Sequence, residues 1–318
     1  MSPSLPVIHA LYENPDWLPP LVGALEAEGF TVRAHEIWHG VIEAAQAPEA
    51  GIWLNRMSPS SHTRGHPESV GLMREVLAWL EDHGRRVING SRAFELEISK
   101  LRQDAVLRRH GILTPRTVLV VGREQLVQAA RTFNGPFLTK HNQGGKGLGI
   151  HLFQDAEEIR RYVGSDGFDP GPNGQLVLQE YITAREPVVT RVELVGGRFL
   201  FAMQSSTAGG FELCPSDVCQ AEKKAPAAPD VCPADGASAF SPSPLSGDDP
   251  IVEQYRRLCA AEGIDIAGIE FVEDAQGRRY TYDINANTNY SGVLGQRIGI
   301  DGMREVARWL RASVGAAS

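Results

Sequence analysis

Acidic and amide side chains gather in residues 265–290, DIAGIEFVEDAQGRRYTYDINANTNY. Apolar and polar residues alternate on both sides of a glycine-containing turn, which predicts two antiparallel strands. With residues 274–277 as the loop, Glu270 lies opposite Thr281. Residues two apart share one face of a strand, so Asp283 and Asn285 join that face. Two carboxylates and an amide oxygen together are suitable ligands for Mg²⁺.

The other face of this hairpin is predicted to pack on a core. An ordinary solvated surface is the alternative interpretation of the polar face, but such a surface more often carries Lys, Glu or Thr than the small amides of DINANTN. We therefore favour the metal site. The apolar face holds Ile269, Phe271, Tyr280, Tyr282 and Ile284.

A glycine-rich turn, GGKGLG at residues 144–149, has residue types that bind phosphate. It is not a P-loop, because Lys146 is followed by Gly147 rather than by Ser or Thr. It is not a dinucleotide fingerprint, because a strand, IHLF, follows instead of a helix. Glycines let the backbone approach a ligand closely, and Lys140 and Lys146 add positive charge. A plain glycine hairpin is the alternative.

The segment LVLQEYITAREP, residues 176–187, is an apolar strand that ends in polar residues and leads into further strands. It is typical of a hinge between two units. A buried strand with an acidic end is the alternative.

The elements that position these motifs fall into three predicted units. Residues 1–90 alternate strand and helix patterns, which indicates a small parallel α/β domain. Its polar segment NRMSPSSHTRGHPES follows a strand, where open α/β sheets bind ligands. Residues 91–183 begin with one long helix, residues 91–111, and contain the glycine hairpin. Residues 184–318 are predicted as antiparallel strands followed by helices and the acidic hairpin.

Residues 205–249 form a long irregular stretch in the last unit, and loops of that length are often lids or binding loops. Cys214, Cys219 and Cys232 crowd into it. Reduced thiols are favoured over a zinc cluster, because no fitting fourth ligand is evident.

Composition sets outer limits on function. The 318 residues are 42% hydrophobic and 22% charged, as in an ordinary globular protein, and the net charge is −8. Nucleic acid is not an expected partner, because no basic run tracks a phosphate backbone. No membrane is expected either, because no stretch approaches the ~18 apolar residues of a span. The first residues lack the pattern of a secretory signal, so a cytoplasmic location is expected.

In content and order, four motifs resemble the ATP-grasp superfamily, most closely the RimK-like glutamate ligases and the glutathione-synthetase group. They are Lys100, Lys140 with GGKGLG, QEYI with Glu186, and the set Glu270, Asp283 and Asn285. The resemblance spans roughly residues 88 to 295. It implies an α/β and α+β architecture, in which an N-terminal parallel α/β (pre-ATP-grasp) domain precedes two α+β subdomains that clasp ATP.

The resemblance also implies roles for individual residues. Lys100 and Lys140 would hold the α and β phosphates, and Glu186 the ribose hydroxyls. The ATP-binding set is Lys100, Lys140, Gly144, Gly145, Lys146, Gly147, Gln179, Glu180, Tyr181, Ile182 and Glu186, in which residues 179–182 meet the adenine edge. Glu270, Asp283 and Asn285 match the ligands of two Mg²⁺ ions, with Mn²⁺ as an alternative. His141 replaces a common proline, Asp283 replaces the commoner glutamate, and residues 205–249 have no counterpart in the better-known members.

The implied activity is that of an ATP-dependent carboxylate–amine ligase, which forms an amide through an acyl phosphate and releases ADP and phosphate. Small molecules or peptides would be the substrates, and a homodimer stays open. Arg191 is the candidate for stabilising developing negative charge. Rival interpretations are an ATP-binding module without ligase activity and an ATP-grasp kinase or phosphotransferase. The candidate substrate contacts are Arg56, whose guanidinium suits a carboxylate, Asn287, Asn289 and Tyr290.

Overall fold

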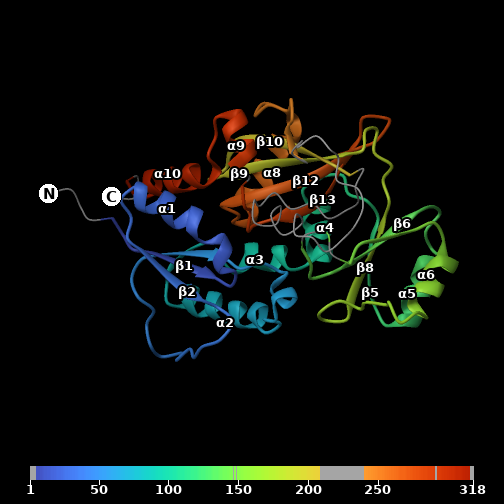
Figure 1. The fold of residues 1–318 in the computed structure, drawn as a ribbon, viewed down its shortest axis with the longest axis horizontal. Helices are drawn as coiled ribbons and strands as arrows, with labels where there is room; N and C mark the ends of the chain where they lie inside the picture. The colour runs from blue at the N-terminus through green and yellow to red at the C-terminus, as the bar shows by residue number, and fades with distance from the viewer. Residues whose placement is uncertain (1–4, 146, 148, 208–239, 291, 316–318) are drawn as a thin grey trace, which may run out of the picture.

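A computed structural model describes residues 5–145, 147, 149–207, 240–290 and 292–315. Lys146 and the three cysteines at 214, 219 and 232 lie outside the described residues, so the predictions made for them are not addressed. The described chain forms three sheets, which occupy three lobes of the molecule (Figure 1). Within these residues, none of the helices has the length and apolar character needed to cross a bilayer.

The N-terminal sheet is parallel, as predicted from the alternation of strands and helices. Both faces of this sheet are covered, as is usual for a parallel sheet. One face packs on α1 (Pro19–Ala27) and on the C-terminal helix α10 (Gly302–Gly315), and the other on α2 (Ser69–Asp82). Short 3₁₀ helices, η1 (Pro15–Trp17) and η2 (Ser61–Arg64), follow strands β1 and β3. The strand order is β2 (Val32–Glu36), β1 (Ile8–Tyr12), β3 (Ile52–Arg56) and β4 (Arg86–Ile88).

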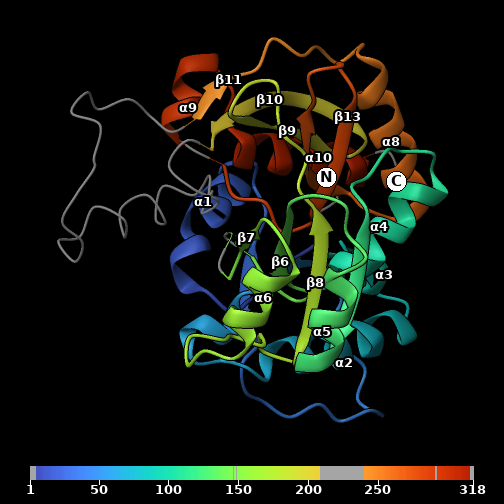
Figure 2. The same ribbon diagram turned by 90° about the vertical axis from the view of Figure 1, so that its right-hand side faces the viewer.

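The middle sheet is antiparallel and carries α5 (Arg123–Ala130) and α6 (Ala156–Val163) on one face. The predicted glycine hairpin is confirmed, since β6 and β7 pair antiparallel on either side of the turn. In Figure 2 the two helices lie in front of this sheet. The strand order is β5 (Thr117–Val121), β8 (Gln175–Glu180), β6 (Phe137–His141) and β7 (His151–Phe153).

The third sheet is also antiparallel, and its apolar face forms the largest core with α8 (Pro250–Glu262). Helices α3 (Ser91–Glu97) and α4 (Lys100–Arg109) contribute apolar side chains to this same core. Helix α9 (Gly292–Ile298) lies against the edge at β11. The strand order is β11 (Phe240–Pro242), β10 (Arg198–Ser206), β9 (Val188–Val195), β12 (Ile266–Glu273) and β13 (Arg279–Asn285).

The prediction of a single helix over residues 91–111 is wrong. The structure has two helices, α3 (Ser91–Glu97) and α4 (Lys100–Arg109). Ser99 is extended between them and caps α4, because its side chain accepts a hydrogen bond from the backbone N–H of Arg102. The break also lets the N–H of Lys100 bond to the carbonyl of Asn142 next to the glycine turn.

The register predicted for the acidic hairpin is also wrong. Glu270 pairs with Asp283 rather than with Thr281, and Thr281 pairs with Phe271. The pairing is shifted by one residue from the turn onward, since Glu273 pairs with Arg279 rather than with Arg278. A β-bulge then leaves Tyr282 as an extra residue, which brings Asp283 opposite Glu270. Thr281 turns into the core, where it bonds to the hydroxyl of Tyr255, while Tyr282 joins the polar face.

Candidate active site

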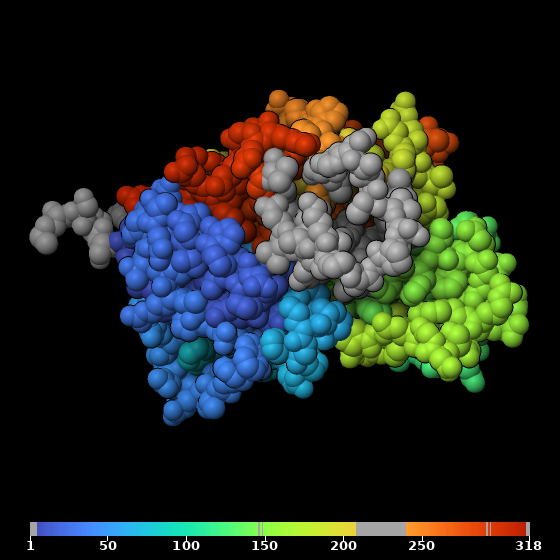
Figure 3. Space-filling model, in the orientation of Figure 1, coloured from blue at the N-terminus to red at the C-terminus, as the bar shows by residue number. Residues whose placement is uncertain are grey.

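One deep cleft lies between the middle sheet and the C-terminal sheet. Residues from all three lobes line it, including the strand end at residues 179–182, the glycine turn and the acidic hairpin. In Figure 3 the middle lobe, in green, stands at one side of the molecule and the other two lobes at the opposite side. The cleft is therefore where the predicted motifs, spread over some 190 residues of sequence, come together.

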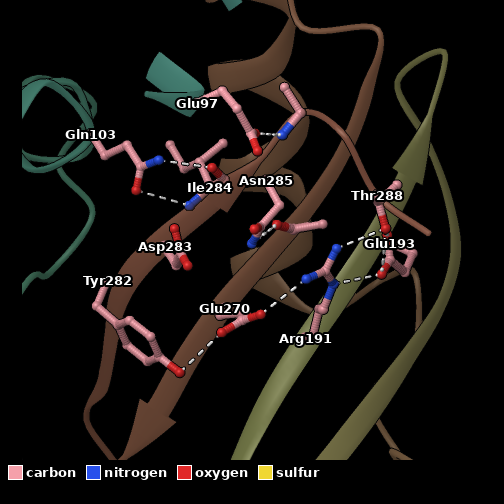
Figure 4. Close-up of polar contacts among 12 residues, drawn as sticks. Glu97, Gln103, Arg191, Glu193, Glu270, Tyr282, Asp283, Ile284, Asn285 and Thr288 are labelled. Atoms are coloured by element: carbon pink, nitrogen blue, oxygen red, sulfur yellow. Dashed lines mark hydrogen bonds and ion pairs between the residues drawn. The ribbon is translucent and has the colours of Figure 1, made fainter. Parts of the chain in front are cut away.

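The predicted metal set does converge, although it does so through the bulge. Glu270, Asp283 and Asn285 all line the cleft. Figure 4 shows their side chains around one space on the open face of the hairpin. Glu270 accepts hydrogen bonds from Arg191 at 3.0 Å and from the hydroxyl of Tyr282 at 3.1 Å. Among the described residues no three His, Cys, Asp or Glu side chains form a metal-binding group.

This donor set fits Mg²⁺ better than a transition metal. Two carboxylates and one amide are hard oxygen ligands, and Mg²⁺ in nucleotide sites takes only one or two carboxylates and completes its shell with phosphates and water. A site closed by protein ligands alone would need more donors than the hairpin provides. The residues present therefore fit a magnesium ion that arrives with a nucleotide.

Lys100 and Asp283 form an ion pair across the cleft floor. Helix α4 begins at Lys100, so the break at Ser99 fixes where this ammonium lies. Burial alone would raise the pKa of Asp283, but the adjacent Lys100, with help from Lys140, holds it below its usual value. Asp283 is thus ionised and able to bind a cation.

Lys140 enters the same cleft from β6 and is almost fully buried. Its ammonium donates to Oε1 of Gln179 at 2.7 Å and lies 4.6 Å from the ring centre of Tyr282. Burial lowers the pKa of Lys140 to about 8, and the attraction of Asp283 only partly offsets this. A buried ammonium with an amide and an aromatic face as neighbours is well suited to a further, anionic partner.

The glycine turn forms part of the cleft wall through Gly144, Gly145 and Gly147. Gly149, with φ of +71°, has a second constraint: a Cβ there would lie 2.6 Å from the imidazole of His141. Glycine is therefore needed both for the backbone conformation and for the space that His141 occupies. His141 also lies 3.2 Å from Asp169, which ties the base of the turn to residues 169–174.

The strand end at residues 179–182 lines the cleft as expected. The backbone N–H groups of Glu180 and Tyr181 bond to the carbonyls of Arg116 and Pro136 at 2.8 and 3.0 Å. These two donors are therefore engaged in the middle sheet, which leaves the backbone around Ile182 to meet a ligand.

Arg191 lies at the centre of a buried polar network on the C-terminal sheet (Figure 4). Its Nε donates to Glu193 at 2.7 Å, Nη1 to Glu270 at 3.0 Å and Nη2 to the hydroxyl of Thr288 at 2.7 Å. Burial alone would lower the pKa of Arg191, but Glu193 and Glu270 raise it above the usual value. The guanidinium is therefore a fixed positive charge at the cleft wall.

Three predicted site residues do not line the cleft. Glu186 is exposed on the segment between β8 and β9. Arg56 is buried behind the wall, where it donates to the carbonyl of Thr288 at 2.9 Å and to Oδ1 of Asn289 at 2.5 Å. Tyr290 packs against Phe201 with its hydroxyl buried. Asn287 and Asn289 do line the cleft, as predicted.

Sequence reasoning missed several cleft residues. Glu97, at the end of α3, accepts a hydrogen bond from the N–H of Ala286, and burial raises its pKa to about 7. Tyr282 was assigned to the core face because the bulge was not foreseen. Trp17 and Ser58 enter from the N-terminal lobe. The general rule about strand ends indicated the segment of Ser58, and nothing in the sequence indicated Trp17.

Comparison with known proteins agrees with this architecture. Residues 98–213 match the family model of the RimK-like ATP-grasp domain. Beta-citrylglutamate synthase B of Danio rerio is 23% identical over 230 residues, 71% of this chain and 50% of that protein. A probable alpha-L-glutamate ligase 2 of Pseudoalteromonas atlantica is 29% identical over 136 residues, 42% of this chain and 44% of that protein. The chain thus spans about half the length of the curated relatives it matches.

Solved structures cover nearly the whole chain. A RimK domain protein ATP-grasp from Sphaerobacter thermophilus superposes with a TM-score of 0.65 at 17% identity, over 95% of this chain and 98% of that one. The ligase PsnB with a minimal precursor, Mg and ADP gives 0.64 at 16% identity, over 96% of each chain. D-cycloserine synthetase DcsG gives 0.63 at 17% identity, over 96% of this chain and 99% of that one. The chain therefore has the ATP-grasp fold, and the part of it that matches the RimK-like family model is residues 98–213.

Proposed function

We propose that the protein is an ATP-dependent carboxylate–amine ligase. In this reaction the substrate carboxylate takes the γ-phosphoryl group of ATP to give an acyl phosphate and ADP. An amine then attacks the acyl carbon, phosphate leaves, and an amide remains. A free carboxylate is a poor electrophile at neutral pH, so the phosphoryl group provides the leaving group that amide formation needs.

The nucleotide would lie between the middle and C-terminal sheets. Its adenine would meet the strand end at residues 179–182, and its phosphates would face the ammonium groups of Lys100 and Lys140. The glycine turn at residues 144–149 would cover the phosphates and keep water from the acyl phosphate. Glu186 would need to move toward the cleft to reach the ribose, because it is exposed in the present structure.

Glu270, Asp283 and Asn285 are proposed to hold magnesium, as two ions, with manganese as the alternative. When bound, magnesium would neutralise charge on the transferring phosphoryl group. Asp283 and Glu270 would exchange their present partners, Lys100 and Arg191, for the metal. The released ammonium and guanidinium groups would then face the phosphates, so the same four side chains serve both states.

Arg191 is proposed as the catalytic cation. Phosphoryl transfer depends mainly on positioning and on charge stabilisation, so a fixed guanidinium can act without forming a covalent bond. The same group could stabilise the oxyanion that forms when the amine attacks.

The substrates are proposed to be a small-molecule or peptide carboxylate and an amine. Asn287 and Asn289 line the cleft and can bond to them through their amides. Arg56 and Tyr290 do not line the cleft, so they would affect the substrates indirectly, by holding the segment that contains Asn287 and Asn289. The domain limits at residues 90 and 183 stay a prediction, since α3 and α4 pack on the C-terminal sheet.

The convergence of two lysines and two carboxylates in one cleft is the observation that carries this proposal. A phosphate-release screen over amino acids, dipeptides and dicarboxylic acids, with mass spectrometry of products, tests it. We expect ADP and phosphate to form only when carboxylate and amine are both present, together with a product of their combined mass less one water. AMP and pyrophosphate would indicate an adenylating enzyme instead, and phosphorylated carboxylate that accumulates without amine dependence would indicate a kinase.

A further inference from the structure

Glu193 is a carboxylate in the middle of strand β9 with 0% of its surface exposed. Its strand neighbours Val192 and Leu194 turn to the apolar core, so Glu193 shares the opposite face with Arg191. Burying a carboxylate costs several kcal/mol unless it is paired and hydrogen-bonded, so an acid at this position requires compensation. The mechanism proposed above uses Glu193 in no step.

That compensation comes from two groups. Glu193 accepts a hydrogen bond from Nε of Arg191 at 2.7 Å and lies 3.1 and 3.2 Å from the hydroxyl of Thr288. Thr288 in turn accepts from Nη2 of Arg191 at 2.7 Å. Glu193 and Thr288 therefore hold two edges of one guanidinium, while the third edge points to Glu270.

Gly268 leaves room for this arrangement. It lies on β12 directly opposite Glu193. A Cβ at this position would be 2.2 Å from Nη2 of Arg191 and 2.5 Å from Cζ, well inside van der Waals contact. The backbone of Gly268 has no positive φ, so the conformation does not require glycine. The space for the guanidinium does.

The charges explain why two acids serve one arginine. Glu270 is the proposed metal ligand, so metal binding would take it away from Arg191. Glu193 is too deeply buried to follow, so its carboxyl group stays beside the guanidinium in both states; burial raises the pKa of this carboxyl, and Arg191 partly offsets that rise. Without Glu193, the arginine would lose its last carboxylate partner among the described contacts at the moment when its position matters most.

The arrangement is also tied to the N-terminal lobe. Arg56 donates to the carbonyl of Thr288 at 2.9 Å and to the side chain of Asn289 at 2.5 Å. Asn287 donates back to the carbonyl of Arg56 at 3.0 Å. The Thr288 hydroxyl that borders Arg191 is thus held in place from the far side of the cleft wall.

We propose that Glu193 and Gly268 are positioning residues, which hold the guanidinium of Arg191 flat across strand β12 with its Nη1 edge toward the phosphoryl-transfer site. Glu193 does so by charge and hydrogen bonding, and Gly268 by the absence of a side chain. The proposal rests on the proposed ligase function, because that function gives Arg191 its catalytic role.

Two variants separate charge from space. Glu193→Gln keeps the size and removes the charge, and Gly268→Ala keeps every charge and removes the space. We expect each to lower kcat by roughly 10- to 100-fold, because small displacements of a catalytic group have effects of that size. The KM for MgATP should stay within about twofold, because Arg191 acts on the transition state rather than on nucleotide binding.

Glu262→Gln is the matched control. Glu262 is 3% exposed and paired with Arg109 and His110, but it does not line the cleft. It should lower the thermal midpoint as Glu193→Gln does and leave kcat unchanged. If Glu193→Gln and Gly268→Ala match this control in kcat, or if both raise KM without lowering kcat, the positioning role is overturned while the ligase function stands.

Crystal structures of the two variants give a readout that does not depend on turnover. In both variants we expect the guanidinium of Arg191 to move away from residue 268 and to lose at least the contact of Nη2 with Thr288. An unchanged guanidinium in either variant overturns the proposal, even if the wild-type protein proves inactive with every carboxylate tried.

Discussion

Each carboxylate of the proposed metal set already has a cationic partner, and these partners differ. Asp283 pairs with Lys100, whose helix begins at that residue, and Glu270 pairs with the buried Arg191. A metal that binds here must therefore compete with the ammonium group of Lys100 and the guanidinium group of Arg191. The competition also gives a benefit, because the cations released are adjacent to where the phosphates would lie.

Glu270→Gln and Asp283→Asn should each lower phosphate release by about 100-fold or more, since either change removes charge that balances the metal and the transferring group. Far-UV circular dichroism should stay that of the wild type, because both changes keep side-chain size. Phosphate release at the wild-type rate in both variants would rule out this metal site.

The pKa of Lys140 predicts a pH dependence of nucleotide binding. Burial lowers this pKa to about 8 in the folded protein, from the usual lysine value of 10.5. ADP should bind the charged form, so its affinity should fall by about tenfold per pH unit above pH 8. Calorimetry from pH 7 to 9.5 measures this slope. Lys140→Arg should remove it, because arginine stays charged, and an unchanged slope would assign the titration elsewhere.

The same shift affects stability with the opposite sign. Between about pH 8 and 10.5 the unfolded chain binds a proton at Lys140 that the folded chain has lost. The contribution of Lys140 to the free energy of unfolding should therefore increase as pH rises through this window. Below pH 8 the lysine is charged in both states, and burial of that charge costs stability.

At the scale of residues, the sequence was informative wherever chemistry is encoded by residue type. Lys100, Lys140, Glu270, Asp283 and Asn285 could be predicted, and the structure brings all of them to one cleft. The pairing of Glu193 with Arg191 could also have been predicted, because an acid between Val192 and Leu194 in an apolar strand shares a face with Arg191. The contact between Glu193 and Thr288 could not be predicted, because it spans 95 residues of sequence.

At the scale of elements, the acidic hairpin shows where pattern reading ends. Alternation predicted two strands and the shared face of Asp283 and Asn285, since both lie on one side of the bulge. It could not predict the bulge, because one inserted residue leaves the composition of the strand unchanged. The extra residue brings Tyr282 into the cleft, where it contacts both Lys140 and Glu270.

The break between α3 and α4 is the second such case, and it gives a prediction. Ser99 caps α4, so Ser99→Ala should lower the free energy of unfolding by about 1 kcal/mol. Ser99→Asp should retain most of the cap, because aspartate is an equally good N-cap residue. Urea unfolding of the two variants measures the difference. Equal stability of the alanine and aspartate variants would mean that packing alone sets the break.

At the scale of the whole molecule, Asn89 joins the N-terminal sheet to the C-terminal one. Its side chain donates to the carbonyls of Ile266 and Ala286 and accepts from the N–H groups of Asp265 and Ile266. It has φ of +52°, a conformation that asparagine adopts more readily than most residues. The sequence predicted only that a unit ends at residue 90, and it gave no role to Asn89.

Two substitutions at Asn89 separate its contacts from its backbone conformation. Asn89→Gly loses the four hydrogen bonds and tolerates the positive φ, so it should cost roughly 3 kcal/mol or more through unpaired buried groups. Asn89→Ala should cost about 1 kcal/mol beyond that, because alanine resists a left-handed backbone. Denaturant unfolding compares them. If alanine proves as stable as glycine, the backbone at this junction is relaxed in solution.

The account as a whole depends on a carboxylate that becomes phosphorylated in the cleft between the middle and C-terminal sheets. The most direct measurement uses a carboxylate that supports phosphate release, labelled with ¹⁸O in both oxygens, with mass spectrometry of the products. We predict ADP together with inorganic phosphate that carries one ¹⁸O, because the acyl phosphate loses its bridging oxygen to phosphate when the amine attacks. Label in AMP, or unlabelled phosphate with amide formed, would contradict the acyl-phosphate mechanism.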